Sequence, residues 1–200
     1  MNFLRIKYLS LLFLILPIDT NAQILKINNS LSANWSNNGG KKIYKYTPTI
    51  GLEYLEIPHF SLSSNIGLSH KCQEYPIFNG ESAIEVNIKY LEINTIGRLI
   101  LDANNVSLFI GIGPTIDWKI KSEYKIHGEI KENTSVQGDF IAKENVINLL
   151  TELGFYKDFN KFRFYIFSAY KSNITNIIQE TKRGFIGHSL SLNLSLGYKL

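Results

Sequence analysis

The sequence contains one cysteine, Cys72, among 200 residues. A single cysteine cannot close an internal disulfide, and Cys72 belongs to no motif with the spacing of metal ligands. It also stands away from the N-terminal leader, so it provides no lipoprotein anchor. The Gly111-Ile112-Gly113 stretch lacks the third glycine and the following helix of a dinucleotide fingerprint. We therefore expect no disulfide, no metal site and no cofactor.

Blocks of charge are also missing. Lys and Arg number 21 against 17 Asp and Glu, and the net charge of +4 is spread along the chain. Without a basic patch interleaved with aromatic residues, we expect no nucleic acid as a partner. The hydrophobic content of 44% and the charged content of 19% are ordinary for a folded chain, and the length suggests one domain.

The third absence is a long apolar run. The longest run, 8–17, has about ten residues, whereas a membrane-spanning helix needs about 20. Basic residues precede this run, and small or polar residues follow it up to Ala22, which is the pattern of a secretory signal. We expect residues 1–22 to be a cleaved signal peptide and 23–200 to form the mature domain. If that domain resides in a membrane, it must cross it as a β-barrel.

Alternation of apolar and polar side chains dominates the rest of the sequence. It is clearest from His188 to Leu200, where it runs without a break. The apolar members are Leu190, Leu192, Leu194, Leu196, Tyr198 and Leu200. Because successive side chains point to opposite faces of a strand, this segment must lie between an apolar medium and a polar one.

Seven further segments show the same period and predict strands. With the last one, the predicted strands are 24–35, 43–55, 60–69, 86–100, 106–120, 146–156, 162–171 and 188–200. Pro48 cannot donate to a ladder, so we expect a bulge or local irregularity there. The apolar parity changes within 86–100. We expect a bulge near Tyr90 to restore it and to turn Glu92 and Arg98 to the polar face.

The predicted connections alternate in length, at about 7, 4, 14, 5, 24, 5 and 15 residues. No helical period interrupts the strands, and eight is a number at which an up-and-down sheet closes. Bacterial outer-membrane barrels have short periplasmic turns and longer extracellular loops. We therefore predict an all-β fold, an eight-stranded antiparallel up-and-down transmembrane β-barrel in the outer membrane. Its longest loop, 121–144, would be extracellular.

Alternation alone leaves open which face points inward. A soluble, lipocalin-like carrier of an apolar ligand would have its apolar face inside. Three features favour the opposite arrangement. The apolar parity carries almost no charge, aromatic residues lie near strand ends, and the polar parity is rich in small residues that fit a narrow lumen. We expect the apolar face to contact outer-membrane lipid.

Ionisable residues on the inward parity are the candidates for a specific role. They are Glu53, Glu92, Arg98, Asp117, Lys119, Glu152, Arg163 and Lys171. In a narrow lumen they must pair, because an unpaired buried charge costs several kcal/mol. We expect Arg98 and Arg163 to pair with Glu53 and Glu152 toward the periplasmic end. Such a network plugs the lumen, and the alternative is a narrow, gated pore.

Catalysis is a further alternative. A lipid-modifying barrel enzyme needs a serine, a histidine and an acid grouped at the level of the outer leaflet. His188 adjoins Ser189 and His70 adjoins Ser69, but neighbours in a strand point to opposite faces. We therefore expect no catalytic residues and no enzyme.

Four segments resemble the PorT-like outer-membrane β-barrel family of Bacteroidetes, which is grouped with porin-family barrels. They are Lys89 to Ile93, Phe109 to Pro114, Ser172 to Ile177 and Leu194 to Leu200. The sequence departs from the family pattern at Asn94, where proline is usual, and at Leu200, where an aromatic is commoner. The resemblance implies an outer-membrane barrel without established catalytic residues. An accessory barrel of a secretion machinery remains the alternative role.

Partners are expected at two places besides the lipid. Loop 121–144 would contact other envelope proteins, because binding residues concentrate on loops. Leu196, Tyr198 and Leu200 resemble the C-terminal signal that the barrel assembly machinery recognises.

That C-terminal signal gives a first testable prediction. Replacing both Tyr198 and Leu200 with aspartate should abolish membrane assembly, because the signal requires an aromatic and an apolar residue at these positions. Gel mobility with and without heating measures the folded barrel. A normal heat-modifiable band from the double variant would show that the end of the chain is not recognised in this way.

Overall fold

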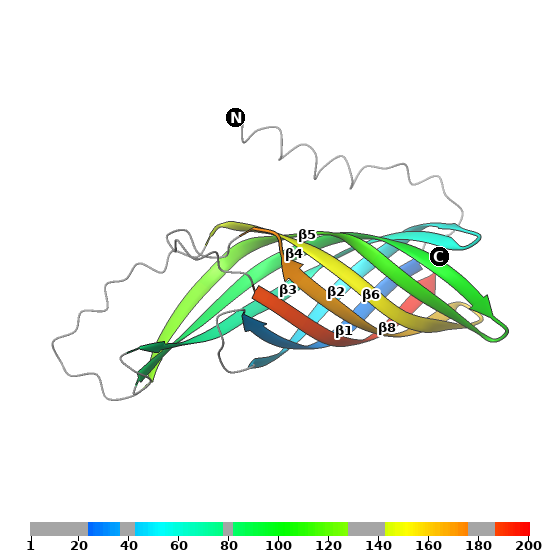
Figure 1. Cartoon of the computed structure of the whole chain (residues 1–200). Helices are drawn as coiled ribbons and strands as arrows, with labels where there is room; N and C mark the ends of the chain where they lie inside the picture. Colours follow the sequence, from blue (N-terminus) through cyan, green and yellow to red (C-terminus); the bar gives the residue numbers. More distant parts are fainter. Residues whose placement is uncertain (1–23, 37–42, 78–81, 128–142, 176–186) are drawn as a thin grey trace, which may run out of the picture.

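The computed structural model describes residues 24–36, 43–77, 82–127, 143–175 and 187–200 (Figure 1). This part of the chain forms eight strands. They are β1 (Ile24–Ser36), β2 (Ile43–Ile57), β3 (Phe60–Ile77), β4 (Ser82–Ala103), β5 (Val106–His127), β6 (Asn145–Phe159), β7 (Phe162–Asn173) and β8 (Gly187–Lys199). Among the described residues, no helix is long and apolar enough to cross a membrane. The expected signal peptide, 1–22, lies outside the described ranges.

The strands form one closed sheet. Each strand pairs antiparallel with the next along the chain, and β1 pairs with β8. The closing ladder runs from Ile24 opposite Lys199 to Ser36 opposite Gly187. Because the first and last strands pair with each other, neither leaves an open edge along the barrel. The predicted eight-stranded antiparallel up-and-down barrel is confirmed.

The two faces of the sheet differ as the alternation predicts. On β8 the side chains of Leu190, Leu192 and Leu194 are 50%, 56% and 55% exposed, whereas Ser189 and Asn193 are buried. Most of the other strands likewise have apolar side chains outside and small polar ones inside. This arrangement is the reverse of the apolar interior that a lipocalin-like carrier needs.

The two ends of the barrel differ in their connections. At the short-turn end, two-residue turns join β2 to β3, β4 to β5 and β6 to β7. His59, Asn104 and Asn160 adopt a positive φ in these turns, at 66°, 51° and 51°, a conformation in which asparagine is enriched. The opposite end, the long-loop end, carries the longer connections.

Three strands continue beyond the barrel at the long-loop end, toward the left of Figure 1. We call this part the β3–β4–β5 extension. The predicted loop 70–85 is largely wrong, because β3 runs to Ile77 and β4 begins at Ser82. β5 likewise runs to His127, into the predicted loop 121–144. Alternation could not reveal these segments, since a hairpin that leaves the barrel no longer separates an apolar medium from a polar one.

Of the two effects expected at Pro48, the structure shows a local irregularity in pairing and no bulge. The β1–β2 register is unbroken at Pro48. The shift in the β2–β3 register lies between Glu53 and Leu55, and the described β2–β3 ladder ends at Thr49 opposite Gly67. Pro48 has no N–H with which to extend that ladder, so the proline limits pairing instead of forming a bulge.

The bulge expected near Tyr90 belongs to the neighbouring strand. The register shifts between Lys89 opposite Lys121 and Tyr90 opposite Lys119, so the extra residue is Ile120 of β5. β4 itself keeps one parity, and its inward face carries apolar and charged side chains together. The buried members are Val86, Ile88, Tyr90, Glu92, Asn94, Ile96, Arg98 and Ile100. The predicted phase correction within 86–100 is therefore wrong, although Glu92 and Arg98 do face inward.

One close approach in the sheet depends on glycine. A Cβ atom at Gly113 would lie 1.9 Å from the carbonyl oxygen of Thr95, whereas one at Gly97 would lie 3.5 Å from the Phe60 ring and 4.0 Å from the carbonyl oxygen of Ile112. Gly113→Ala should lower the free energy of unfolding by about 1–3 kcal/mol, because backbone must shift to admit the methyl group. Gly97→Ala is the matched control and should change it little. Urea unfolding in micelles measures both, and equal stabilities would contradict the steric argument.

Candidate functional site in the barrel lumen

The short-turn half of the lumen contains a network of buried charges centred on Glu53 of β2. Its carboxylate accepts hydrogen bonds from Lys26 Nζ at 3.3 Å, Arg98 Nη1 at 3.0 Å and Arg163 Nη1 at 3.3 Å. The hydroxyl of Tyr165 donates to it at 3.3 Å. Glu53 is 1% exposed. Three other strands, β1, β4 and β7, therefore direct polar groups at one buried carboxylate.

Two further acids complete this network. Glu152 Oε2 accepts from Arg98 Nε at 2.9 Å and from Arg98 Nη2 at 2.6 Å. Asp158, near the short-turn end of β6, receives both Nε and Nη2 of Arg163, at 2.6 and 2.8 Å. Each guanidinium thus connects Glu53 to a second acid. The three cations Lys26, Arg98 and Arg163 match the three anions Glu53, Glu152 and Asp158, and the exposed Asp158 also pairs with Lys199 Nζ at 2.8 Å.

Aromatic rings fill the space beside the two arginines. The guanidinium carbon of Arg98 lies 4.7 Å from the Phe109 ring centroid, and that of Arg163 lies 4.0 Å from the Tyr156 centroid. Phe109 also contacts Tyr165 and Phe167, with centroids 6.4 and 5.9 Å apart. Cation–π contacts of this kind gain strength where water is excluded. Charges and rings together form a packed layer across the short-turn half, which we call the plug.

A second charge cluster lies toward the long-loop end. Asp117 Oδ2 receives Lys71 Nζ at 2.9 Å and Asn148 Nδ2 at 2.9 Å, and Lys171 Nζ lies 3.7 Å away. Lys171 also pairs with Glu92. Two lysines therefore balance two acids here as well. Apart from Lys199, whose side chain is 36% exposed, both clusters have as many cations as anions, as burial of charge in a narrow space requires.

A row of amides extends from the second cluster across the barrel wall. Asn94 donates to Glu92 at 3.0 Å, Asn65 donates to Asn94 at 2.7 Å, and Asn28 donates to Asn65 at 3.1 Å. Asn28 also donates to Thr49 at 2.8 Å. The row crosses four neighbouring strands, so the side chains inside the barrel support its register as well as its charge balance.

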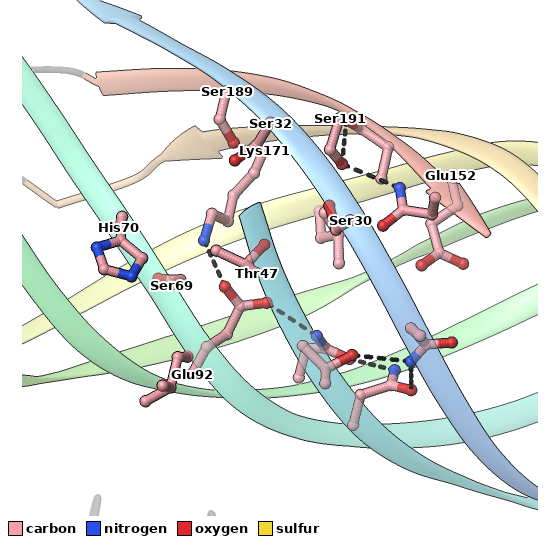
Figure 2. A pocket seen from close by; sticks show the side chains of 18 of the residues that line it. Ser30, Ser32, Thr47, Ser69, His70, Glu92, Glu152, Lys171, Ser189 and Ser191 are labelled. Carbon is pink, nitrogen blue, oxygen red and sulfur yellow. Dashed lines mark hydrogen bonds and ion pairs between the residues drawn. The ribbon is translucent and has the colours of Figure 1, made fainter. Parts of the chain in front are cut away.

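On the long-loop side of the plug, the lumen contains a polar cavity of about 70 Å³. Figure 2 shows Lys171 reaching across it to Glu92, with Ser30, Ser32 and other serines around it. The walls are mostly hydroxyl and amide groups, and Glu152 and Phe167 belong to its lining. A cavity of this size admits a few waters or one small polar group. Leu68, Leu150, Phe167 and Ala169 contribute apolar surface to the lining, but the cavity is too small for a large ligand.

The structure brings most of the predicted lumen residues together. Glu53, Arg98, Glu152 and Arg163 share one network, but Arg163 pairs with Asp158 as its second acid instead of Glu152. The others meet in the second cluster or at its border. They are Glu92, Asp117 and Lys171, with Lys119 paired to Glu144.

Three members of the two networks were missed by sequence reasoning. Lys26 lies on the inward parity of the first predicted strand, so its alternation was a usable signal. Lys71 lies in a segment predicted as loop, and Asp158 in a predicted turn. The sequence pattern does not assign either position to the inward or the outward face of a strand. Their partners are therefore visible only from the register of the strands.

The two histidines considered for catalysis lie in different places, and only His70 shares a site with a serine and an acid, because Ser69 and Glu92 also line its cavity. His188 is on the outer face, stacked on Trp35 with centroids 6.0 Å apart, and its Nδ1 is 2.7 Å from the Tyr170 hydroxyl. Ser189 faces inward and is buried. His70 and Ser69 both border the cavity. Within the described ranges, no group of three or more His, Cys, Asp or Glu side chains is arranged to hold a metal ion.

The C-terminal residues lie on the outer face at the short-turn end. Leu196 and Tyr198 are each 40% exposed and Leu200 is 70% exposed. The Tyr198 ring packs edge-on against Phe162, with centroids 5.5 Å apart. The C-terminal end of β8 thus presents apolar side chains outward.

The fold and lumen describe a closed barrel that is apolar outside and filled with balanced charge inside. No family model matches the sequence, and no curated protein matches it. Among solved structures, it is similar to Neisserial surface protein A, with a TM-score of 0.56 and 10% identity over 89% of this chain and 97% of that one. OprG from Pseudomonas aeruginosa has a TM-score of 0.49, with 12% identity over 90% and 97% of the two chains. Ail of Yersinia pestis has a TM-score of 0.45, with 12% identity over 90% and 99%.

At 10% identity, the likeness to Neisserial surface protein A concerns the fold alone. It agrees with the closed order of strands from β1 to β8. The chain therefore has the fold of an eight-stranded barrel of the outer-membrane type.

The central acid of the plug gives a prediction on stability. Glu53→Gln removes the anion shared by Lys26, Arg98 and Arg163 and leaves excess positive charge buried. The free energy of unfolding should fall by about 3–5 kcal/mol, as for other broken buried ion pairs. Urea titration of the barrel in micelles measures it.

Two variants test the cause of that loss. Glu144→Gln makes the same chemical change in a pair whose acid is 74% exposed, and it should cost less than about 1 kcal/mol. Adding Lys26→Met to Glu53→Gln removes one excess cation and should restore part of the stability. Equal losses for Glu53→Gln and Glu144→Gln would contradict the role of charge balance.

Proposed function

We propose that this protein is an outer-membrane β-barrel of structural or envelope-interaction type, with a plugged lumen. Its short turns would face the periplasm and its long-loop end the outside of the cell. The proposal includes the cleaved signal peptide, 1–22, and recognition of Leu196, Tyr198 and Leu200 by the barrel assembly machinery. We also infer kinship with the PorT-like family of Bacteroidetes, on the four segments that resemble it.

The observation that carries the proposal is the contrast between the outer face and the lumen. Large apolar side chains are exposed outside on every strand of the barrel wall, from Leu25 of β1 to Leu196 of β8. In water, so large an exposed apolar surface would be costly, whereas lipid removes that cost. Aromatic side chains lie near both ends of this surface, including Trp35 and Tyr170 at one end and Phe162 and Tyr198 at the other, as interfacial girdles do.

The packed plug supports a role without transport. Its charges are already paired with one another, and its rings occupy the space between them. An ion that entered would have to break these pairs, which is costly in a confined site. The narrow pore therefore ranks below the plugged barrel.

The long-loop end supports a role in contacts. The β3–β4–β5 extension projects beyond the barrel wall, and β5 ends in it at His127 (Figure 1). Loops held on a rigid scaffold are the usual place for recognition. We propose other envelope proteins as partners of 121–144, and a non-enzymatic role, since the outward His188 and inward Ser189 cannot act together.

Membrane residence and the plug are tested on the same protein. The mature protein should remain in the membrane fraction until detergent is added, and recovery from the aqueous fraction would overturn the proposal. In planar bilayers it should show no conductance steps. Phe109→Ala with Phe167→Ala removes two buried rings of the plug and should produce measurable current.

The control for the current is a matched pair of rings on the outer face. Phe155→Ala with Phe164→Ala removes side chains that are 42% and 49% exposed and should leave the bilayer current at baseline. Heat modifiability verifies that each variant is folded. Conductance of the unaltered protein would favour the narrow pore instead.

A further inference from the structure

Two successive outward-facing rows cross β3, β4 and β5 at the long-loop border of the apolar surface. The first row is apolar, with Leu68 opposite Leu91 and Leu91 opposite Trp118. The next outward row toward the long-loop end has Lys89 opposite Lys121, and the β3 residue opposite Lys89 is His70, which borders the lumen cavity. We call these the apolar row and the basic row. A change from apolar to cationic side chains between one row and the next is what a lipid interface requires of a barrel wall.

The bulge in β5 creates the basic row. Lys119 keeps the inward parity of Asp117, with its side chain 20% exposed. The extra residue, Ile120, turns outward and is 54% exposed. Lys121 then also points outward, with its side chain 66% exposed, beside Lys89. If the same sequence alternated regularly, without a bulge, Ile120 would be opposite Lys89 and Lys121 would point inward. Bulges commonly redirect side chains in this way.

Two lysines directly opposite each other on neighbouring strands repel, which costs stability unless an anion lies between them. The acids on this face lie farther from the apolar row. Glu123 is opposite Asn87 in the next row, and Glu85 is farther out still. Glu123 Oε1 pairs with Lys121 Nζ at 2.6 Å, with both side chains about half exposed or more. The layer nearest the apolar row is therefore cationic, and the acidic layer lies behind it.

We propose that the basic row binds the phosphate of an anionic lipid in the outer leaflet, with the acyl chains of that lipid on the apolar row. The phosphate sits at the boundary between headgroup and hydrocarbon, which is where Lys89 and Lys121 stand relative to Leu68, Leu91 and Trp118. Lys89 and Lys121 supply the charge. His70 ends the row beside the cavity. This site requires the membrane residence proposed above. It specifies anionic lipids as the class that this face of the barrel selects.

Tryptophan fluorescence tests the site directly. The chain has two tryptophans, so Trp35→Phe leaves Trp118 of the apolar row as the reporter. The protein is placed in phosphatidylcholine vesicles in which either phosphatidylcholine or phosphatidic acid carries brominated chains that quench tryptophan on contact. Phosphatidic acid should be preferred at Trp118 by about fivefold, from the attraction of a lysine near a membrane surface. Added salt should reduce this preference, because exposed charges are screened.

Three variants assign the preference to the basic row. Lys89→Gln with Lys121→Gln should bring the preference to about one, and Glu123→Gln should raise it because Lys121 loses its acid. Lys157→Gln with Lys161→Gln removes two lysines near the opposite, short-turn end and should leave it unchanged. Symmetric vesicles present the same lipid to both ends, so the two double variants are matched. Heat modifiability verifies folding.

The outcomes separate the site from the membrane proposal. Quenching by both brominated lipids with a preference of one in the unaltered row would overturn the phosphate site and leave membrane residence intact. A preference that survives Lys89→Gln with Lys121→Gln would also overturn it. Absence of quenching by either lipid would overturn membrane residence itself.

Discussion

Closure of β1 on β8 is the constraint on which the rest of the structure depends. A closed sheet satisfies the backbone hydrogen bonds of both outer strands, and it also fixes a narrow interior with no route by which an inward side chain can reach solvent laterally. Every charge on the inward parity must then find a partner inside. Glu53, for example, accepts hydrogen bonds from side chains of three other strands. The need for charge partners thus connects strands that are distant in the sheet.

The lumen satisfies the constraint with two neutral clusters instead of an apolar core. Buried ion pairs add little net stability compared with well-packed apolar residues, but breaking one is costly. The gain lies in specificity: a slip of β4 by one residue would turn Arg98 outward and break its ion pairs with both Glu53 and Glu152. Charge inside and apolar surface outside thus reinforce the same register.

How much the sequence predicts depends on whether a segment has one apolar and one polar face. The segment 188–200 does, and the alternation there predicted both the strand and the direction of its side chains. The pairing of Arg98 with Glu53 and Glu152 followed from parity and from the up-and-down order of strands. In the β3–β4–β5 extension no such alternation exists, so the strand around Lys71 was predicted as loop. The bulge at Ile120 was placed in the wrong strand, because a phase change in one sequence segment does not say which of two paired strands carries the extra residue.

Pro48 has a consequence for how the barrel comes apart. Among the described residues, eight pairs join β2 to β3, against eleven or more at every other boundary. Local opening is cheapest where few backbone hydrogen bonds must break. We therefore expect the barrel to open first between β2 and β3, where Pro48 shortens the ladder. The pairing between the terminal strands β1 and β8 should open later. Amide protons at the long-loop end of β2 would exchange with solvent before those of β1 and β8.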